Sequence, residues 1–265
     1  MPGALGFPGV FPSPASGQTP PAGTVGAAAT ATPTAPRPRA TPTIQPPTAT
    51  RALPTATPAP TFTPVPTATP TPIVVTFQKG AQLYSDSFAA PVKWPLTSDS
   101  NLALSVLDGR YHVRVLPARY WGWQCAPNAQ ALSAVANLVM EVSAKVEEGP
   151  ETSAYGLLFR FVDNKNFYRL HVTPAGKWEF GKFLNGTWSV ISPLNVSDAI
   201  PKGNQTVTLR VVAKGNTFAF FANGVQLGTA ADSSLGAGNL CLSTAAQGDG
   251  SVHVSYDDVN VWEAK

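Results

Sequence analysis

The stretch that decides the fold is "FRFVDNKNFYRLHVTPAGKWEF", residues 159–180. Apolar or aromatic side chains alternate with polar ones along most of it, which is the two-residue period of a β-strand with one face in a core. Two turn signals interrupt the alternation, "DNKN" at 163–166 and "TPAGK" at 173–177. The stretch therefore predicts three antiparallel strands joined by hairpins, the second hairpin around a three-residue loop with glycine in a left-handed conformation.

The two turns also predict the register of the hairpins. The loop at 174–176 predicts these cross-strand pairs: Val172 with Trp178, Leu170 with Phe180, and His171 with Glu179. The loop at 163–166 predicts three more: Phe161 with Tyr168, Phe159 with Leu170, and Arg160 with Arg169. Every pair on the core side is apolar or aromatic, and a slip by one residue would bury the charges instead.

Arg160, Arg169, His171 and Glu179 share the face of these strands that turns away from the core. Two arginines directly opposite one another repel unless an acid or an anion lies between them. Glu179 is diagonal to Arg169 and is the nearest candidate counter-ion within the strands. Two interpretations stay open, a salt-bridged sheet surface and a face that contacts a ligand.

Strand-like runs recur through residues 73–265, and helical periodicity is nearly absent there. The runs lie at 73–77, 102–107, 111–116, 137–146, 155–161, 167–172, 177–183, 206–213, 217–222, 239–244 and 251–262. The dipeptides Gly215-Asn216 and Asn223-Gly224 are hairpin signals that make residues 206–228 a three-stranded meander. Short alternating strands between turns predict an all-β fold, an antiparallel two-sheet sandwich.

Composition divides the chain near residue 72. Residues 1–72 hold 19 of the 27 prolines and no Asp or Glu, and repeat "PTAT" three times, so we expect a disordered, Pro/Thr-rich stalk there. Residues 73–265 form the predicted sandwich domain. The net charge of +3 comes from three scattered arginines in the stalk, because basic and acidic residues cancel in the rest. Scattered charges of this kind do not indicate a nucleic-acid partner.

No secretory signal is recognisable at the start of the chain, and no run of about 18 apolar residues occurs, so we expect no membrane span. A Thr/Pro stalk before a β domain usually faces outward. We therefore expect an extracellular or cell-surface location, with the true start or an anchor upstream of Met1.

The globular part resembles the concanavalin A-like lectin/glucanase jelly roll, including the laminin G-like modules and a bacterial 3-keto-disaccharide hydrolase-like domain of unknown function. The resemblance rests on "YGLLFRFVDNKNFYRLHVTPAGKWEF" at 155–180, "TLRVVAKGNTFAFFANGVQLG" at 208–228, "GNLCLST" at 238–244 and "SYDDVNVW" at 255–262. It implies two stacked antiparallel sheets over about residues 80–263, with sugars held on the concave face or at its rim. These motifs specify architecture more than chemistry.

The carboxylate pattern argues against catalysis. Glycoside hydrolases of family sixteen on this fold carry Glu-x-Asp-x-x-Glu on one strand, and no such spacing occurs in this sequence. Glu179 beside His171 could act as a general acid or base, but a second carboxylate is not evident nearby. We therefore expect a non-catalytic module, with a glycoside hydrolase of the keto-glycoside type as the alternative.

The segment "ARYWGWQC" at 118–125 reads as a loop that offers Trp121 and Trp123 for stacking on a sugar ring. Trp178 and Trp262 read as core residues. In "GNLCLST", Leu240 and Leu242 are expected to face the core, which leaves Cys241 on the polar side. In an oxidising compartment a Cys125–Cys241 disulfide would fix the tryptophan loop over the polar face, and the alternative is two unpaired thiols.

The resemblance also implies a structural calcium ion. Many members of this fold bind calcium through an acidic residue near the first strand and another near the last, and Asp86 and Asp257 or Asp258 occupy comparable places. The alternative is that these carboxylates cap turns.

Taken together, the sequence predicts a stalk-borne module that binds carbohydrate or another extracellular polymer. Its predicted ligand residues are Arg160, Arg169, His171, Glu179, Trp121 and Trp123. A purely structural or adhesive spacer domain is the second alternative.

Overall fold

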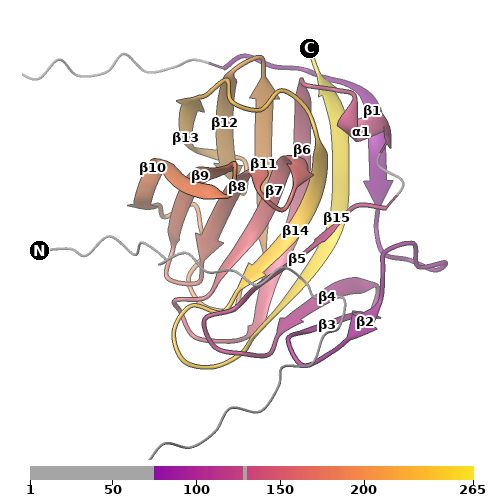
Figure 1. Cartoon of the computed structure of the whole chain (residues 1–265), viewed down its shortest axis with the longest axis vertical. Helices are drawn as coiled ribbons and strands as arrows, with labels where there is room; N and C mark the ends of the chain where they lie inside the picture. Colours follow the sequence, from indigo (N-terminus) through magenta and orange to yellow (C-terminus); the bar gives the residue numbers. More distant parts are fainter. Residues whose placement is uncertain (1–74, 128–129) are drawn as a thin grey trace, which may run out of the picture. The chain divides into compact units, whose positions relative to one another are not determined.

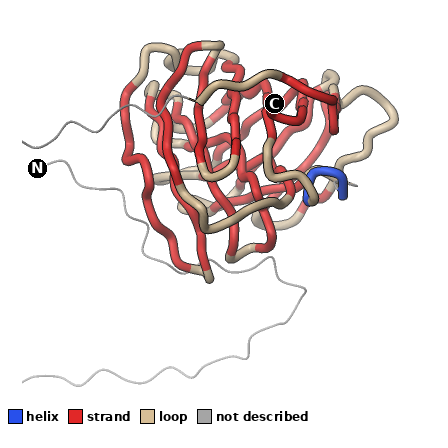
Figure 2. Tube along the Cα trace, turned by 90° about the horizontal axis from the view of Figure 1, so that it is seen from above, coloured by secondary structure: helices blue, strands red, loops and turns tan. Residues whose placement is uncertain are grey.

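The computed structural model describes residues 75–127 and 130–265, and these form a sandwich of two antiparallel β-sheets (Figure 1). The predicted all-β jelly-roll architecture is confirmed. The predicted stalk at 1–72, and the domain boundary that it implies, lie outside the described residues. A single short helix, α1 (Gln130–Ser133), occurs in the described part and lies at the periphery of the strands (Figure 2).

The larger sheet has nine strands. Eight of them follow the order β13 (Val225–Ala231), β12 (Thr217–Ala222), β11 (Val207–Lys214), β6 (Leu138–Glu148), β15 (Val252–Ala264), β4 (Arg110–Val115), β3 (Leu102–Leu107) and β2 (Thr97–Ser98). The ninth strand, β1 (Lys79–Asp86), pairs with the C-terminal half of β15, whose N-terminal half pairs with β4. The long strand β15 therefore pairs with β6 along one side and with both β4 and β1 along the other.

The smaller sheet has six strands and carries the candidate site. Its order is β10 (Thr187–Val196), β9 (Lys177–Leu184), β8 (Asn166–Thr173), β7 (Ala154–Asp163), β14 (Asn239–Ala245) and β5 (Trp121–Cys125). The edge strands β10 and β5 are absent from the runs that the sequence predicted. Both pair on one side only, and they contain Pro193 and Gly122, which are unfavourable in central strands.

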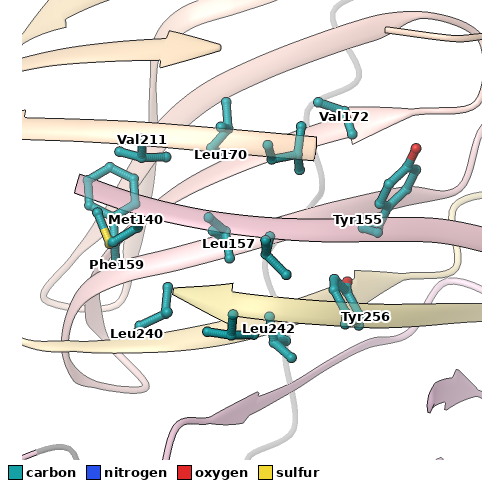
Figure 3. Packing of buried hydrophobic residues seen from close by; sticks show 14 of the residues in the cluster. Met140, Tyr155, Leu157, Phe159, Leu170, Val172, Val211, Leu240, Leu242 and Tyr256 are labelled. Atoms are coloured by element: carbon teal, nitrogen blue, oxygen red, sulfur yellow. The ribbon is translucent and has the colours of Figure 1, made fainter. Parts of the chain in front are cut away.

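The core lies between the two sheets. Leu157, Leu170 and Leu242 of the smaller sheet meet Met140 and Val211 of the larger one (Figure 3). The period of two sends the alternate residues of each strand to the opposite faces. On the smaller sheet these form a second layer, which we call the outer cluster: Trp121, Ala154, Leu158, Phe167, Phe183, Cys241 and Ala245, with Trp123, Cys125, Phe161 and Trp188 packed against them.

The hairpin between β8 and β9 has the predicted register. Val172 pairs with Trp178, Leu170 with Phe180 and His171 with Glu179, and Gly176 adopts the expected left-handed conformation with φ +74°. Both dipeptide turns are also confirmed, with Lys214 paired to Thr217 and Ala222 paired to Val225.

The register between β7 and β8 is wrong by two residues. Phe159 pairs with Tyr168, not with Leu170, although the register at the turn itself, where Asp163 pairs with Asn166, agrees with the predicted loop. An irregularity between Phe159 and Asp163 takes up the difference. A shift of two residues keeps each side chain on its face, so the core side of β7 is still correct up to Phe159.

Two smaller predictions are also wrong. Residues 75–77, the described part of the run at 73–77, are not a strand. Trp262 is not in the core between the sheets, because it lies on the outer face of the larger sheet with Phe77 and Phe221, under the ammonium group of Lys79. The segment before β1 packs against this face, and Gln78 exchanges backbone hydrogen bonds with Lys265.

Candidate ligand-binding pocket

One row of residues crosses the outer face of the smaller sheet. The strand pairings place Trp123, Ser243, Gly156, His171 and Glu179 side by side in β5, β14, β7, β8 and β9. Because Gly156 has no side chain, His171 reaches across β7, and its Nε2 lies 2.9 Å from Ser243 Oγ. The sequence predicted the pair of His171 and Glu179 but not its link to Ser243.

Arg169 lies beside this row in a buried ion pair. Its Nη2 donates to Glu179 Oε1 at 2.7 Å, and its side chain is 4% exposed. Its Cζ lies 3.9 Å from the ring centroid of Trp188 and 5.2 Å from that of Trp121, so two indoles exclude water from the guanidinium. A Cβ at position 181 would lie 2.5 Å from the Trp188 ring, so Gly181 allows that indole to lie over β9.

The charges of this group follow from its burial. Burial lowers the pKa of Arg169, and the nearby Glu179 carboxylate raises it, but a guanidinium stays protonated. Burial, reinforced by the charge of Arg169, holds the pKa of His171 well below its ordinary range, so this imidazole is neutral at pH 7. Its Nδ1 and the Nε of Arg169 have no hydrogen-bond partner in the part of the chain that the structure describes.

These side chains form the floor of a pocket of about 220 Å³, which we call the β8–β9 pocket. Its floor consists of Arg169, His171, Thr173, Lys177 and Glu179. Its walls include Glu151 and Thr152 before β7, Leu194 of β10 and Gln247 after β14. Thr152 Oγ1 donates to the backbone carbonyl of Gln247 at 2.6 Å, which ties the two wall loops together.

Sequence reasoning missed most of the wall. Lys177 could have been found, because it lies two residues before Glu179 and therefore shares its face. Glu151 and Gln247 carry no local signal, since only the tertiary structure brings their loops to β8. Glu151 is a second carboxylate in the same pocket, which the sequence had not revealed.

Arg160 does not belong to this face. It lies in the irregularity of β7 with φ +46°, and Leu158 takes the expected place beside Arg169. The Arg160 guanidinium donates to the backbone carbonyls of Ala136, Gly215 and Leu235 at 2.7 to 2.9 Å. It is 2% exposed and therefore ties three loops together at one end of the sandwich. The predicted opposition of two arginines is wrong, and we remove Arg160 from the candidate site.

The two tryptophans lie in strand β5 and not in a loop. Trp121 is 7% exposed and packs on Phe167 and Phe183, and its Nε1 donates to Ser243 Oγ. Its ring lies 6.1 Å from that of His171 and 5.2 Å from Cζ of Arg169, and its burial leaves little surface for stacking on a sugar. Trp123 is half-buried beside it.

The predicted Cys125–Cys241 disulfide is confirmed. The two cysteines pair directly across β5 and β14, so the bond joins an edge strand to its neighbour. It therefore fixes the strand that carries both tryptophans. A bond of this kind forms in oxidising compartments.

The acidic residues proposed for calcium have other contacts. Asp86 Oδ1 accepts the backbone N–H of Phe88 at 2.8 Å, and Asp257 Oδ1 accepts that of Asp258 at 2.9 Å. Asp257 also lies 3.8 Å from Arg110. Within residues 75–127 and 130–265 no group of three or more His, Cys, Asp or Glu could hold a metal ion. Calcium binding at Asp86 and Asp257 stays a prediction.

No protein-family model and no curated protein matches the sequence. Among solved structures, the carbohydrate-binding module CBM66 from Bacillus subtilis is similar with a TM-score of 0.50 and 20% identity, over 64% of this chain and 100% of that one. A Bacillus subtilis protein of unknown function with a galectin-like fold has a TM-score of 0.53 and 12% identity, over 71% and 99%.

A third similar structure is the GH43 protein BlXynB from Bacillus licheniformis, with a TM-score of 0.50 and 12% identity. The similarity covers 68% of this chain and 39% of that one, so it concerns one part of a larger protein. At these identities the likenesses define the fold alone: a concanavalin A-like jelly-roll sandwich, an architecture that carbohydrate-binding modules also use. No helix in the described part of the chain is long and apolar enough to cross a membrane.

Proposed function

We propose that this protein is a non-catalytic carbohydrate-binding module whose ligand site is the β8–β9 pocket. The observation that carries the proposal is the pocket floor, where the buried pair of Arg169 and Glu179 lies beside His171 and Lys177. Fixed charged and polar groups of this kind can read the hydroxyl groups of a sugar through charge-assisted hydrogen bonds. The fold shared with a carbohydrate-binding module agrees with this function.

The location that we propose is extracellular or at the cell surface. The cross-strand disulfide supports it, because disulfides persist in oxidising compartments. The ligand would then be a glycan or another extracellular polymer.

Hydrolysis of a glycoside is a second candidate because the pocket contains two carboxylates, Glu179 and Glu151. A glycosidase needs one carboxyl group that gives up a proton and one that attacks or activates water. Glu179 instead serves as the anion of a buried ion pair, and Glu151 is exposed at the rim. Binding without turnover is therefore the function that the geometry supports best.

The test is a glycan array with the full chain, followed by calorimetry on each hit. In Glu179→Gln we expect roughly tenfold or greater loss of affinity, because a charge-assisted hydrogen bond and the partner of Arg169 are removed. Glu148→Gln is the matched control, since Glu148 is an exposed carboxylate on the larger sheet. Circular dichroism checks that both variants are folded.

Two results would contradict the proposal. If the wild-type chain binds no glycan saturably, the pocket floor is a salt-bridged surface of a structural module. If the chain turns over a glycoside and Glu179→Gln abolishes the turnover, the protein is an enzyme.

A further inference from the structure

The nitrogen donors on the pocket floor outnumber the acceptors available to them. The guanidinium of Arg169 is buried, it donates to Glu179 through Nη2, and its Nε has no partner among the described residues. A buried donor without an acceptor costs free energy, so such a group favours a ligand that brings acceptors close to it. Arg169 lines the β8–β9 pocket, so a ligand in the pocket lies beside this guanidinium.

His171 adds a second donor of the same kind. The indole N–H of Trp121 can only donate, so Ser243 Oγ accepts it. The hydroxyl proton of Ser243 also needs an acceptor, and Nε2 of His171, at 2.9 Å, is the one at hand. Nε2 is then unprotonated, and a neutral imidazole carries its proton on Nδ1. That N–H is buried and has no acceptor in the described part of the chain.

Lys177 adds a second positive charge to the pocket floor. It is half-buried on the pocket floor, and no carboxylate in residues 75–127 and 130–265 lies within ion-pair distance of its ammonium group. Glu179 is already held by Arg169, and Glu151 stands at the exposed rim, where water screens its charge. Among the buried and half-buried residues that line the pocket, two cations and a neutral N–H donor thus stand against one carboxylate.

The size of the pocket limits the ligand. A volume of about 220 Å³ is smaller than the roughly 300 to 1,000 Å³ of sites for drug-sized molecules, so one sugar ring fits at a time. A carboxylate on that ring is an acceptor only, which matches a floor of unpaired donors.

We infer that the β8–β9 pocket binds a carboxylate-bearing sugar, a uronic acid residue of an acidic polysaccharide, with its carboxylate near Lys177 and the Arg169–His171 floor. This inference rests on the proposed function and adds the chemical class of the ligand. Lys177 is the residue that determines specificity for the acid. A ligand carboxylate can pair with its ammonium group without displacing a carboxylate of the described part of the chain.

The experiment measures binding of the full chain to a panel of polyuronates and to the same polymers after reduction of their carboxyl groups to alcohols. The two forms share backbone and linkage and differ only in charge. We expect the reduced polymer to bind at least roughly tenfold more weakly, and the affinity for the acid to fall as salt is added. Lys177→Met should remove most of the difference between the two forms. Lys165→Met is the control, because Lys165 is exposed in the turn at the opposite end of β8.

The outcomes separate the two proposals. Equal binding of acidic and reduced polymers would overturn the inference and leave the proposed function intact. Binding to a sulfated neutral polymer as tight as to the polyuronates would also overturn it, because the site would then recognise any anion. Failure to bind any glycan, acidic or neutral, would overturn both.

Discussion

Gly156 shows how a single residue shapes the pocket floor. It lies between Ser243 and His171 in the row that crosses the smaller sheet, with φ +154°. A Cβ at this position would lie 2.3 Å from the backbone carbonyl oxygen of Leu170. Backbone would have to move to accommodate it, since no flexible side chain is in the way.

We expect Gly156→Ala to destabilise the fold by about 2 to 3 kcal/mol, from the clash and the unfavourable backbone conformation together. The same change should weaken ligand binding, because it separates His171 from Ser243. Urea denaturation measures the free energy of unfolding. Gly236→Ala is the control, because Gly236 is exposed and its added Cβ would meet no atom within 4 Å. An unchanged midpoint in Gly156→Ala would refute this account of the row.

At the scale of one element, strand β5 depends on its disulfide. It is an edge strand that pairs only with β14 in the smaller sheet, and Cys125–Cys241 joins the two. The bond closes a loop of 116 residues, for which the chain-entropy account gives a stabilisation of about 5 kcal/mol before any strain is subtracted. Loss of this strand would also remove Trp121 from Ser243 and from the guanidinium of Arg169.

Reduction with a thiol should therefore lower the free energy of unfolding by about 2 to 4 kcal/mol and weaken ligand binding in the same samples. Urea denaturation and calorimetry with and without dithiothreitol measure both effects. In the double variant Cys125→Ala/Cys241→Ala, the reductant should change neither quantity. If reduction leaves stability and binding at their oxidised values, β5 does not need the bond.

At the scale of the whole molecule, two of the three histidines, His171 and His253, make stability depend on pH. His112 and His253 form a chain on the outer face of the larger sheet: Arg114 lies 3.1 Å from His253 Nδ1, His253 Nε2 lies 2.7 Å from His112 Nδ1, and His112 Nε2 lies 3.2 Å from the carbonyl oxygen of Leu107. An arginine only donates and a carbonyl only accepts, so every link is satisfied when both imidazoles are neutral. Adding a proton to Nδ1 of His253 would set this nitrogen against the guanidinium of Arg114, which also donates.

Burial, together with Arg114 and His112, lowers the pKa of His253, and the pKa of His171 is lowered as well. The unfolded chain therefore binds protons more tightly than the folded one once the pH drops below about 6.5. We expect the free energy of unfolding to fall on acidification from about pH 7.5 to about pH 5. His253→Gln should flatten part of this dependence, with His171 supplying the rest. A pH-independent free energy in the wild-type chain over this range would contradict the assignment.

The local sequence determined the strands, their faces and several turns. The alternation in 166–184 placed Leu170 in the core and His171 opposite Glu179, because the period of two and the turn geometry are properties of neighbouring residues. The position of Leu240 and Leu242 likewise placed Cys241 on the face where it meets Cys125.

Only the tertiary structure decided which of these side chains form a site. Arg160 lies in a bulge that alternation does not reveal, and its partners are carbonyls of three distant loops. The edge strand β5, the second carboxylate Glu151 and the wall residue Gln247 reach β8 through contacts between segments far apart in the chain. Such contacts depend on how whole sheets pair and stack, and no local pattern of residues encodes them.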